Sequence, residues 1–443
     1  MRAVDDRWAN RAFWIGWSGA AVVLLVLASK QWFVRDDWAV VLTRQADKAA
    51  NGGLDWLLAA QDGHWMTVPV LLWDVTLNVF GLDSYWPYLV PAIAAYLGTI
   101  VLVRIVCRRA GVSAWTTTIV CVLLACFGAG YENLVFAVQI TYNLSLLAFF
   151  AQIVLIDHEG RPDWRDALGG LIALVGVMSS GFGPFFVFGA ALMLVLQRRF
   201  LSLVFLAPAG LALAWWYLTY GSDGAASIYP GSKSLVPEFA YEGISATFRA
   251  LVAGPGLAGL AMLACLGVVV WLRHDLARQA PVLACAATAA VMFIGIGMQR
   301  VGLGIDQAAI SRYVGIGAVL VAPLLALAVD QLARLGDPAL QAGRLVLLAS
   351  IALNLGRLWN DGVHWANMSA ADRNTMELVA GSPRLGEADP EWNRMTVENP
   401  DVRVADIPRL VELGALSPRP PRTTQEEATV DTALGLVANA SGG

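Results

Sequence analysis

The stretch FWIGWSGAAVVLLVLASKQWF, residues 13–33, decides the fold of this chain. It is apolar over about 20 residues, which is enough for a helix to cross the hydrocarbon core of a bilayer. Arg2, Arg7 and Arg11 precede it. A cleaved signal peptide has the same charge order, but its apolar core is only about 7–15 residues long. We therefore expect an uncleaved membrane anchor whose N-terminus lies in the cytoplasm.

Apolar stretches of similar length recur along the chain. Apolar residues make up 57% and charged residues 14% of the sequence, against roughly 45–50% and 25% in ordinary soluble proteins. About eleven segments qualify as spans. Those after the first lie at residues 87–106, 115–130, 142–156, 168–178, 182–196, 201–218, 257–272, 282–298, 314–329 and 345–359. The predicted fold class is an all-α polytopic membrane protein.

Arginines in alternate connections predict the orientation, because cytoplasmic connections carry the excess of basic residues. They are Arg104, Arg108 and Arg109, Arg161 and Arg165, Arg198 and Arg199, Arg273 and Arg278, and Arg334 and Arg344, all on the side of the N-terminus. The outer segments are then residues 34–86, 131–139, 219–256, 299–312 and 360–443. We expect the chain in the plasma (inner) membrane of a bacterium, with an extracytoplasmic C-terminus.

The predicted organisation is a transmembrane domain followed by a tail. The domain covers residues 1–359 and includes the first outer loop, residues 34–86, in which helical spacing predicts three short interfacial helices. Residues 360–443 form the tail, expected to be a small helical module followed by disorder. The net charge of −4 argues against a nucleic-acid partner, because phosphate neutralisation needs a concentrated basic face.

Two carboxylates, Asp36 and Asp37, directly follow the first span at the predicted outer surface. Adjacent carboxylates can bind a metal, or one can act as a general base while the other orients it. The alternative is a solvated helix start, since Asp favours helix N-termini. His64 follows in the same outer loop, where a histidine can move protons or bind phosphate; with Trp65 it is alternatively an interface anchor.

Further polar residues occupy the later outer segments. Glu132 lies at a turn between two apolar spans, where an ionisable group by default suggests function, and a helix cap is the alternative. Arg300, Arg312 and Tyr313 surround the start of a late span; a guanidinium fork suits a phosphate, and snorkelling from a helix end is the alternative. Lys233 is the one cation of a loop rich in aromatic residues, residues 215–241. The rings of this loop can stack on a sugar or hold a lipid, and an aromatic belt at the membrane surface is the alternative.

The order of these features resembles the GT-C glycosyltransferases. It consists of a first span, the outer acidic pair Asp36 and Asp37, interfacial helices with His64 and Pro69, and Glu132 at the family's second acidic position, with Arg312 and Tyr313 as a late match. Many members have Asp-Glu where this chain has Asp-Asp, and one branch has two prolines directly after its histidine where this chain has Trp65 and Met66.

The resemblance implies an enzyme that transfers a sugar from a polyprenyl-phosphate donor to a cell-envelope glycan or lipid acceptor, with inversion at the anomeric carbon. It implies Asp36 or Asp37 as the base, helped by His64, and Arg312 with Arg300, Tyr313 or Lys233 at the donor phosphate. A divalent metal, Mg²⁺ or Mn²⁺, would be held by Asp36 and Glu132. The alternatives are a transporter or flippase of a lipid-linked sugar, and a non-catalytic membrane partner protein.

Overall fold

The computed structural model describes residues 2–436 except residues 52, 62, 222–228, 230, 253, 273 and 274. Within these residues the regular secondary structure is helical, and only one isolated β-bridge is present. The chain forms two compact units. Unit 1 comprises residues 1–24, 59–66 and 92–361, and unit 2 comprises residues 25–58, 67–91 and 362–443. Each unit is described by itself.

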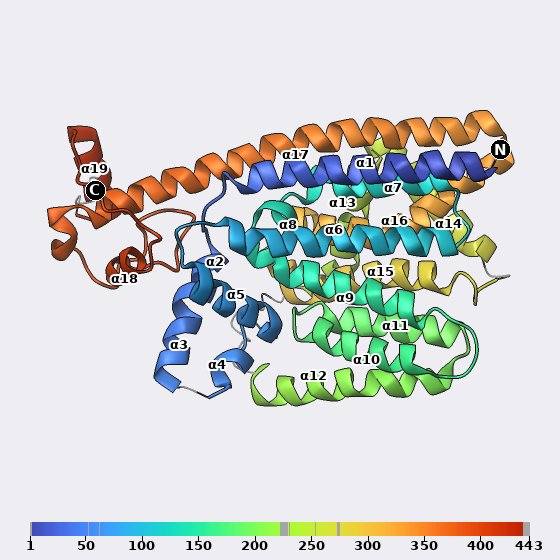
Figure 1. Ribbon diagram of the computed structural model, residues 1–443, viewed down its shortest axis with the longest axis horizontal. Coiled ribbons are helices and arrows are strands. Elements are labelled where there is room, and N and C mark those ends of the chain that lie inside the picture. The colour runs from blue at the N-terminus through green and yellow to red at the C-terminus, as the bar shows by residue number, and fades with distance from the viewer. Residues whose placement is uncertain are drawn as a thin grey trace. The chain divides into compact units, whose positions relative to one another are not determined.

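Unit 1 is a bundle of helices, in which α15 lies beside α16 and α9 lies beside α10 (Figure 1). Its elements are α1 (Arg2–Ala28), α6 (Trp86–Arg109), α7 (Ala114–Ala125), α8 (Glu132–Val135), α9 (Ile140–Ile156), α10 (Trp164–Val177), α11 (Gly183–Leu196), α12 (Ala207–Thr219), α13 (Val236–Leu251), α14 (Pro255–Leu272), α15 (Ala280–Arg300), α16 (Ser311–Gln331) and α17 (Asp337–Ala380). Three helices belong to both units. Helices α1 and α17 begin in unit 1 and end in unit 2, whereas α6 begins in unit 2 and ends in unit 1.

Each predicted span contains a helix, but the first helix ends at Ala28, before the predicted end at residue 33. Eight helices of the described chain are long and apolar enough to cross a membrane. Helices α7, α10 and α11 occupy predicted spans with only 12, 14 and 14 residues. The fold class is thus confirmed as all-α and polytopic.

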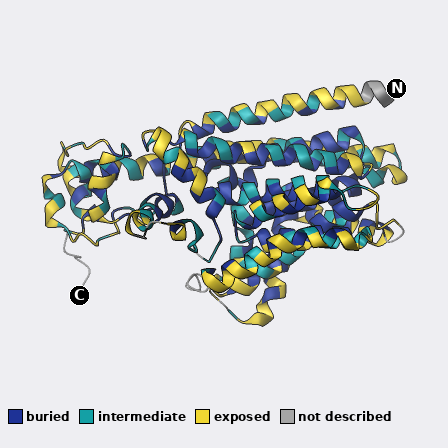
Figure 2. Cartoon of the chain, turned by 60° about the horizontal axis from the view of Figure 1, so that its bottom comes forward, coloured by how far each residue is buried: buried dark blue, intermediate teal, exposed yellow. Residues whose placement is uncertain are grey.

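Burial separates the inner from the outer helices of unit 1. Every residue of α16 from Tyr313 to Val329 is buried, as expected for an apolar helix surrounded by protein. Helix α14, in contrast, exposes large apolar side chains such as Leu260, Leu263 and Val270, which would lie against lipid. Figure 2 shows the same contrast between buried inner and exposed outer faces.

The outer segment at residues 219–256 contains a helix that the sequence analysis missed. Helix α13 buries Phe239, Gly243 and Thr247. A Cβ on Gly243 would come within 2.2 Å of the Phe293 ring in α15, so α13 packs closely into the bundle. Buried small and apolar residues at spacings of three and four were the available signal, which the neighbouring aromatic residues obscured.

Unit 2 contains the short helices predicted in the first outer loop. They are α2 (Asp36–Trp38), the π-helix η1 (Ala39–Thr43), α3 (Arg44–Asn51), α4 (Asp55–Leu58) and α5 (Thr67–Phe80). Helix α5 has 14 residues, fewer than the eight helices long enough to cross a membrane, and its interfacial position stays a prediction.

The tail in unit 2 has a defined path as far as Leu436, beyond the point where its composition predicts disorder. Its helices are α18 (Ile407–Glu412) and α19 (Thr424–Ala433). Helix α19 is held by the Trp392 indole, whose Nε1 donates to the Ala433 carbonyl at 2.7 Å, and by an ion pair between Arg384 and Asp431. A few specific contacts therefore order a segment rich in Pro and charge.

Candidate active site

The first part of the candidate site is the carboxylate pair in unit 2, and its two members differ in environment. Asp37 is fully buried, and its Oδ2 accepts hydrogen bonds from Tyr85 Oη at 2.7 Å and from the Val34 amide at 3.2 Å. Burying a carboxylate is costly unless such bonds compensate for the lost water. Asp36 is only partly buried. Asp37 is therefore suited to a fixed, orienting role and Asp36 to contact with a ligand.

Tyr85, which donates to Asp37, belongs to a cluster of packed aromatic rings. The Phe33 ring lies 4.8 Å from Tyr85 and 5.1 Å from Tyr88, both in edge-to-face geometry, and 5.4 Å from Trp38. Such aromatic pairs are worth about 0.5–1.5 kcal/mol each beyond the area they bury. The sequence therefore builds a stiff wall from residues on both sides of the acidic pair.

Arg35, immediately before the pair, has an unusual backbone conformation. Its φ of 49° and ψ of −127° lie in a region that non-glycine residues rarely adopt. The Arg35 amide donates to Asn399 Oδ1 at 3.1 Å, and its Nε donates to Glu398 Oε2 at 2.6 Å. Trp38 Nε1 donates to the same Asn399 oxygen at 2.9 Å. The tail thus fixes the backbone that leads into Asp36, and such local strain, of order 1–3 kcal/mol, clusters at functional sites.

An ion pair in unit 2 fixes α3 against α5. Lys48 Nζ lies 2.6 Å from Asp74 Oδ1, and Gln45 Nε2 donates to the same oxygen at 3.0 Å. Burial raises the pKa of Asp74, but the hydrogen bonds from Lys48 and Gln45 and the ammonium charge outweigh it, so that the pKa lies below its ordinary value. Asp74 is therefore ionised at neutral pH.

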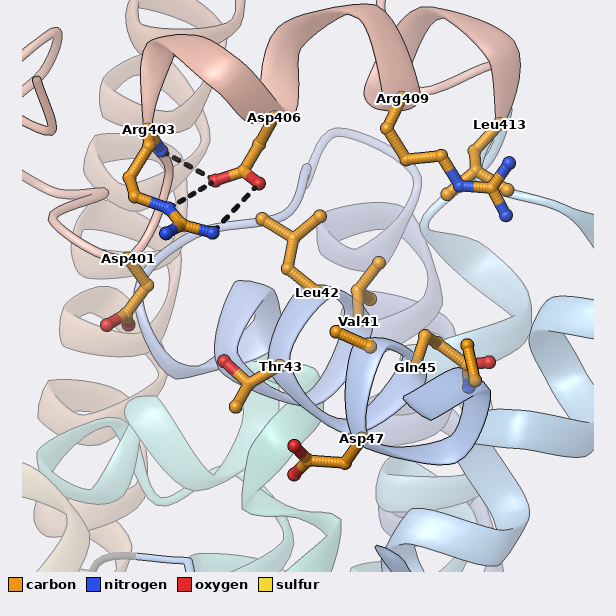
Figure 3. A pocket seen from close by; sticks show the side chains of 12 residues that line it. Val41, Leu42, Thr43, Gln45, Asp47, Asp401, Arg403, Asp406, Arg409 and Leu413 are labelled. Atoms are coloured by element: carbon orange, nitrogen blue, oxygen red, sulfur yellow. Dashed lines mark hydrogen bonds and ion pairs between the residues drawn. The ribbon is translucent and has the colours of Figure 1, made fainter. Parts of the chain in front are cut away.

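A cavity of about 600 Å³ lies in unit 2 between η1–α3 and the tail (Figure 3). Its wall includes the apolar side chains of Val41 and Leu42. Figure 3 shows Arg403 paired with Asp406 on one side of the opening and Asp47 across from them. The volume is in the range of small-molecule sites, and the mixture of an apolar wall, donors and acceptors suits a ligand rich in hydroxyl groups.

In unit 1, His64 lies in a tight turn before α5. The amides and carbonyls of Gln61 and His64 form two hydrogen bonds with each other, at 3.0 and 2.8 Å. A Cβ on Gly181 would be only 2.2 Å from His64 Nδ1, so the absence of a side chain there lets the turn between α10 and α11 approach the imidazole. The neighbouring Trp65 is buried and stacks on Trp216, at 5.4 Å between ring centroids and 3° between planes.

Glu132 and Arg312 lie on adjoining segments of unit 1. The Glu132 amide donates to Ser311 Oγ at 3.2 Å, and Asn133 Nδ2 donates to the Arg312 carbonyl at 2.9 Å. The segments that contain Glu132 and Arg312 approach each other closely because two glycines face each other. A Cβ on Gly130 would be 2.8 Å from the Gly315 Cα.

Tyr313 extends this region towards the glycine turn. Its buried ring lies 6.2 Å from Phe182, the residue after Gly181, and the Arg312 guanidinium carbon is 5.8 Å from the Tyr313 ring centroid. The structure thus connects His64, the turn at Gly181 and Phe182, Tyr313 and Glu132 through successive contacts within unit 1. The sequence analysis did not include Gly181 among the candidate site residues.

The remaining predicted cations lie near the end of α15. Arg300 is the last residue of α15, and Lys233 lies exposed on the short helix η6 (Lys233–Leu235). Tyr229 anchors the loop before Lys233, because its amide donates to the Gln299 carbonyl at 2.7 Å and its carbonyl accepts from the Gly302 amide at 3.0 Å. This places the chain that leads to Lys233 beside the end of α15.

The residues around Glu132 fit a divalent cation in one respect. Four side-chain oxygens of this region are buried and accept no hydrogen bond from the described residues. They are Glu132 Oε2, Asn133 Oδ1, Gln139 Oε1 and Asn143 Oδ1. Mg²⁺ and related hard cations prefer carboxylate and amide oxygens, so the donor set suits the metal expected at Glu132. Asp36, its expected partner, belongs to unit 2.

A second cluster with metal-ligand chemistry, His158, Asp163 and Asp166, lies elsewhere in unit 1. Arg199 Nη2 is 2.8 Å from Asp166 Oδ1 and 2.9 Å from His158 Nε2, so a guanidinium already occupies the space between these ligands. Hydrogen bonding from Arg165 lowers the pKa of Asp163 to about 2. The cluster is therefore best explained as an ionic connection between the start of α10 and the end of α11.

Comparison with known proteins yielded similarity only at the level of structure. No family model matches the sequence, and no curated protein matches it. The chain is similar to ArnT from Cupriavidus metallidurans in a crystal structure bound to undecaprenyl phosphate, with 12% identity and a TM-score of 0.49, over 85% of this chain and 81% of that one. It is also similar to the Archaeoglobus fulgidus oligosaccharyltransferase tethered to an acceptor peptide, with 13% identity and a TM-score of 0.47, over 96% and 63% of the two chains.

Proposed function

We propose that this protein is a membrane glycosyltransferase that transfers a sugar from a polyprenyl-phosphate donor to a hydroxyl of a cell-envelope acceptor. The observation that carries the proposal is the division between the two carboxylates that follow the first span. Asp37 is buried and hydrogen-bonded, whereas Asp36 is partly exposed on a backbone fixed by the tail. Deprotonation of the acceptor requires a base that faces the substrate and is held in place by a rigid support.

In the proposed reaction, Asp36 accepts the proton of the acceptor hydroxyl. The acceptor oxygen forms a bond with the anomeric carbon while the bond from that carbon to the phosphate oxygen breaks, and polyprenyl phosphate leaves. Attack opposite the leaving group inverts the anomeric configuration. His64, held beside Gly181, would assist proton movement, as a group whose pKa normally lies near neutrality can do.

Charge that grows on the leaving phosphate is the largest electrostatic demand of this step. We assign Arg312, beside Tyr313, to that phosphate, with Arg300 and Lys233 as further cations. Glu132 and the buried amide oxygens near it would hold a divalent metal ion. When bound, such an ion would neutralise part of the phosphate charge.

The cavity between η1–α3 and the tail is our candidate for acceptor binding. Its π-helix begins directly after α2, which contains the acidic pair, and π-helical turns occur frequently at functional sites. A sugar ring has an apolar face and hydroxyls that both donate and accept, which matches the apolar wall and the Asp and Arg side chains of this cavity.

The direct test is transfer of radiolabelled sugar from a polyprenyl-phosphate donor to a crude cell-envelope acceptor by purified protein. We expect Asp36→Asn to abolish transfer, and Glu132→Gln to reduce it. Glu427→Gln removes an exposed carboxylate from the same unit as Asp36 and should leave transfer unchanged. Transfer that survives Asp36→Asn, Asp37→Asn and Glu132→Gln alike would contradict the site assignment. Absence of transfer with every donor would favour the alternative functions, a flippase or a non-catalytic partner.

A further inference from the structure

A polar cavity of about 460 Å³ lies in unit 1 where α6 ends and α7 begins. Its lining includes Arg108, Gly111, Ser113, Trp115 and Arg344. These residues belong to connections predicted to face the cytoplasm, or in the case of Trp115 to the adjoining end of a predicted span, and none of them takes part in the proposed glycosyl transfer. The volume is in the range of ligand sites, so this cavity is a candidate for a separate binding function.

A hydrogen-bond network fixes the Arg344 guanidinium in this wall. Arg344 Nε donates to Thr116 Oγ1 at 3.1 Å, and its Nη2 donates to Ser113 Oγ at 3.0 Å. Both hydroxyls in turn donate to the Asp330 carboxylate, at 2.9 and 2.5 Å. Nη1 donates no hydrogen bond within the described chain. A pre-oriented guanidinium with two N–H groups available is suited to an anion.

The second arginine of the wall is held less strongly. Arg108 Nη1 donates to the Val112 carbonyl at 2.8 Å, and Nη2 lies 3.5 Å from a carboxylate oxygen of Asp6. Asp6 has 54% of its side chain exposed, and surface pairs of this kind are worth about 0–1 kcal/mol. A stronger anion could therefore displace Asp6.

The charges around the cavity are predominantly positive. Arg278 contributes a third guanidinium, since its Nη2 lies 3.6 Å from the position a Cβ on Gly111 would take. Against three guanidinium groups stand the carboxylates of Asp6 and Asp330, and the latter is already occupied by hydroxyl donors. An anionic ligand is favoured over a zwitterionic or cationic one.

Apolar groups next to Arg344 indicate what kind of molecule carries the anion. Leu348 lies one helical turn after Arg344 and hence on the same face of α17, and it is 46% exposed. Leu345 is 63% exposed. Trp115 adds an amphipathic ring of the type found at the headgroup level of bilayers. A phosphate attached to acyl chains would contact both parts of this surface.

We infer that this cavity binds the phosphate group of an anionic membrane phospholipid, with an acyl chain along the exposed leucines of α17. Basic pockets between membrane helices bind lipid headgroups in this way. The orientation rule alone accounts for arginines at this end of the bundle. It accounts neither for a cavity nor for a guanidinium whose direction is fixed by Thr116 and Ser113.

The test is binding of phosphatidylglycerol and phosphatidylcholine, with identical acyl chains, to the full-length protein in detergent, measured by native mass spectrometry. We expect phosphatidylglycerol to bind at least tenfold more tightly than phosphatidylcholine. Arg344→Gln and Arg108→Gln should each reduce that affinity about tenfold, whereas Arg165→Gln, a matched loss of an arginine in another connection, should not. Two variants are used so that misfolding of one, judged by its melting temperature, leaves the other informative.

Two results would overturn the inference. One is phosphatidylglycerol affinity unchanged by both cavity variants, or reduced equally by Arg165→Gln, which would indicate only general attraction to basic surface. The other is inorganic phosphate or glycerol phosphate binding as tightly as the lipid and displacing it, which would make the ligand a soluble phosphate. Because the assay requires no glycosyl transfer, its outcome is independent of the proposed function.

Discussion

Gly181→Ala is the substitution that tests the position of His64 most directly. The added Cβ would lie 2.2 Å from His64 Nδ1 and 2.7 Å from its Cε1, whereas non-bonded atoms of this kind are most stable at about 3.5–4.0 Å. The imidazole must therefore retreat by more than about 1 Å. The backbone of Gly181 is not in the left-handed region, so the substitution acts through this contact alone.

A displacement of that size has a predictable kinetic effect. Misplacing a reacting group by about 1 Å can cost about 10²-fold in rate, which corresponds to about 2.7 kcal/mol in activation free energy. We expect Gly181→Ala to lower kcat of sugar transfer by about this factor, while KM for the donor changes little because the phosphate contacts remain. Trp65, stacked on Trp216, resists a compensating movement of the turn.

The assay compares initial rates of label transfer by wild type, Gly181→Ala and Gly210→Ala. Gly210 is a suitable control, because no atom lies within 4 Å of a Cβ placed there. Thermal unfolding of the same preparations reports whether the clash is real, since overpacking costs about 1–3 kcal/mol. A Gly181→Ala protein with wild-type melting temperature would refute the contact, and one that is destabilised but keeps kcat within twofold would refute the role of His64.

Three further predictions concern unit 2. Tyr85→Phe leaves the buried Asp37 carboxylate without one of its donors, so we expect the free energy of unfolding, from thermal denaturation, to fall by about 1–3 kcal/mol. Although burial raises the pKa of Asp74, the contacts with Lys48 lower it overall. This ion pair therefore stabilises the fold above pH 3.8 and ceases to do so as the pH falls through the lower folded-state pKa. Lys48→Met should accordingly lower Tm at pH 7 and reduce its decline below pH 4, as followed by melting scans. Asp47→Asn should raise KM for the acceptor severalfold and leave KM for the donor unchanged in the transfer assay.

Matched variants control these measurements. Tyr241→Phe removes a hydroxyl from a tyrosine that is 62% exposed and should not alter stability. Asp74→Asn should likewise reduce the decline of Tm below pH 4; an unchanged acid limb would contradict the assigned ion pair. Equal effects of Asp47→Asn and of the exposed Glu427→Gln on acceptor KM would rule out acceptor binding in the cavity.

Local features of the fold were predictable because local sequence determines them. Apolar length identifies the spans, and the 3.6-residue period of the first outer loop identifies its short helices. The three short helices predicted in the first outer loop appear as η1–α3, α4 and α5. Helix α13 was missed, although small and apolar residues recur through it, because the signal of an aromatic belt was given more weight.

The sequence suggested candidate site residues but not the contacts between them. The residue types and their order marked Asp36, His64, Glu132 and Arg312 without any knowledge of contacts. The approach of Gly181 to His64 joins segments far apart in the chain, and no local period encodes such a contact. The same holds for Asn399, which receives hydrogen bonds from Arg35 and Trp38. Long-range contacts of this kind depend on tertiary packing, which propensity and spacing do not contain.

The structure distinguishes the two carboxylates, which the sequence alone does not. In sequence, Asp36 and Asp37 are equivalent candidates for the base. In the fold, Tyr85 and the Val34 amide already use the Asp37 carboxylate, which is fully buried in the aromatic wall. To act as base it would have to give up these hydrogen bonds and leave its buried position. Asp36 is only partly buried and follows the strained Arg35 backbone that Glu398 and Asn399 fix, which favours it as the proposed base. The contacts that make Asp37 unsuitable as the base are therefore the same ones that make it an effective support for Asp36.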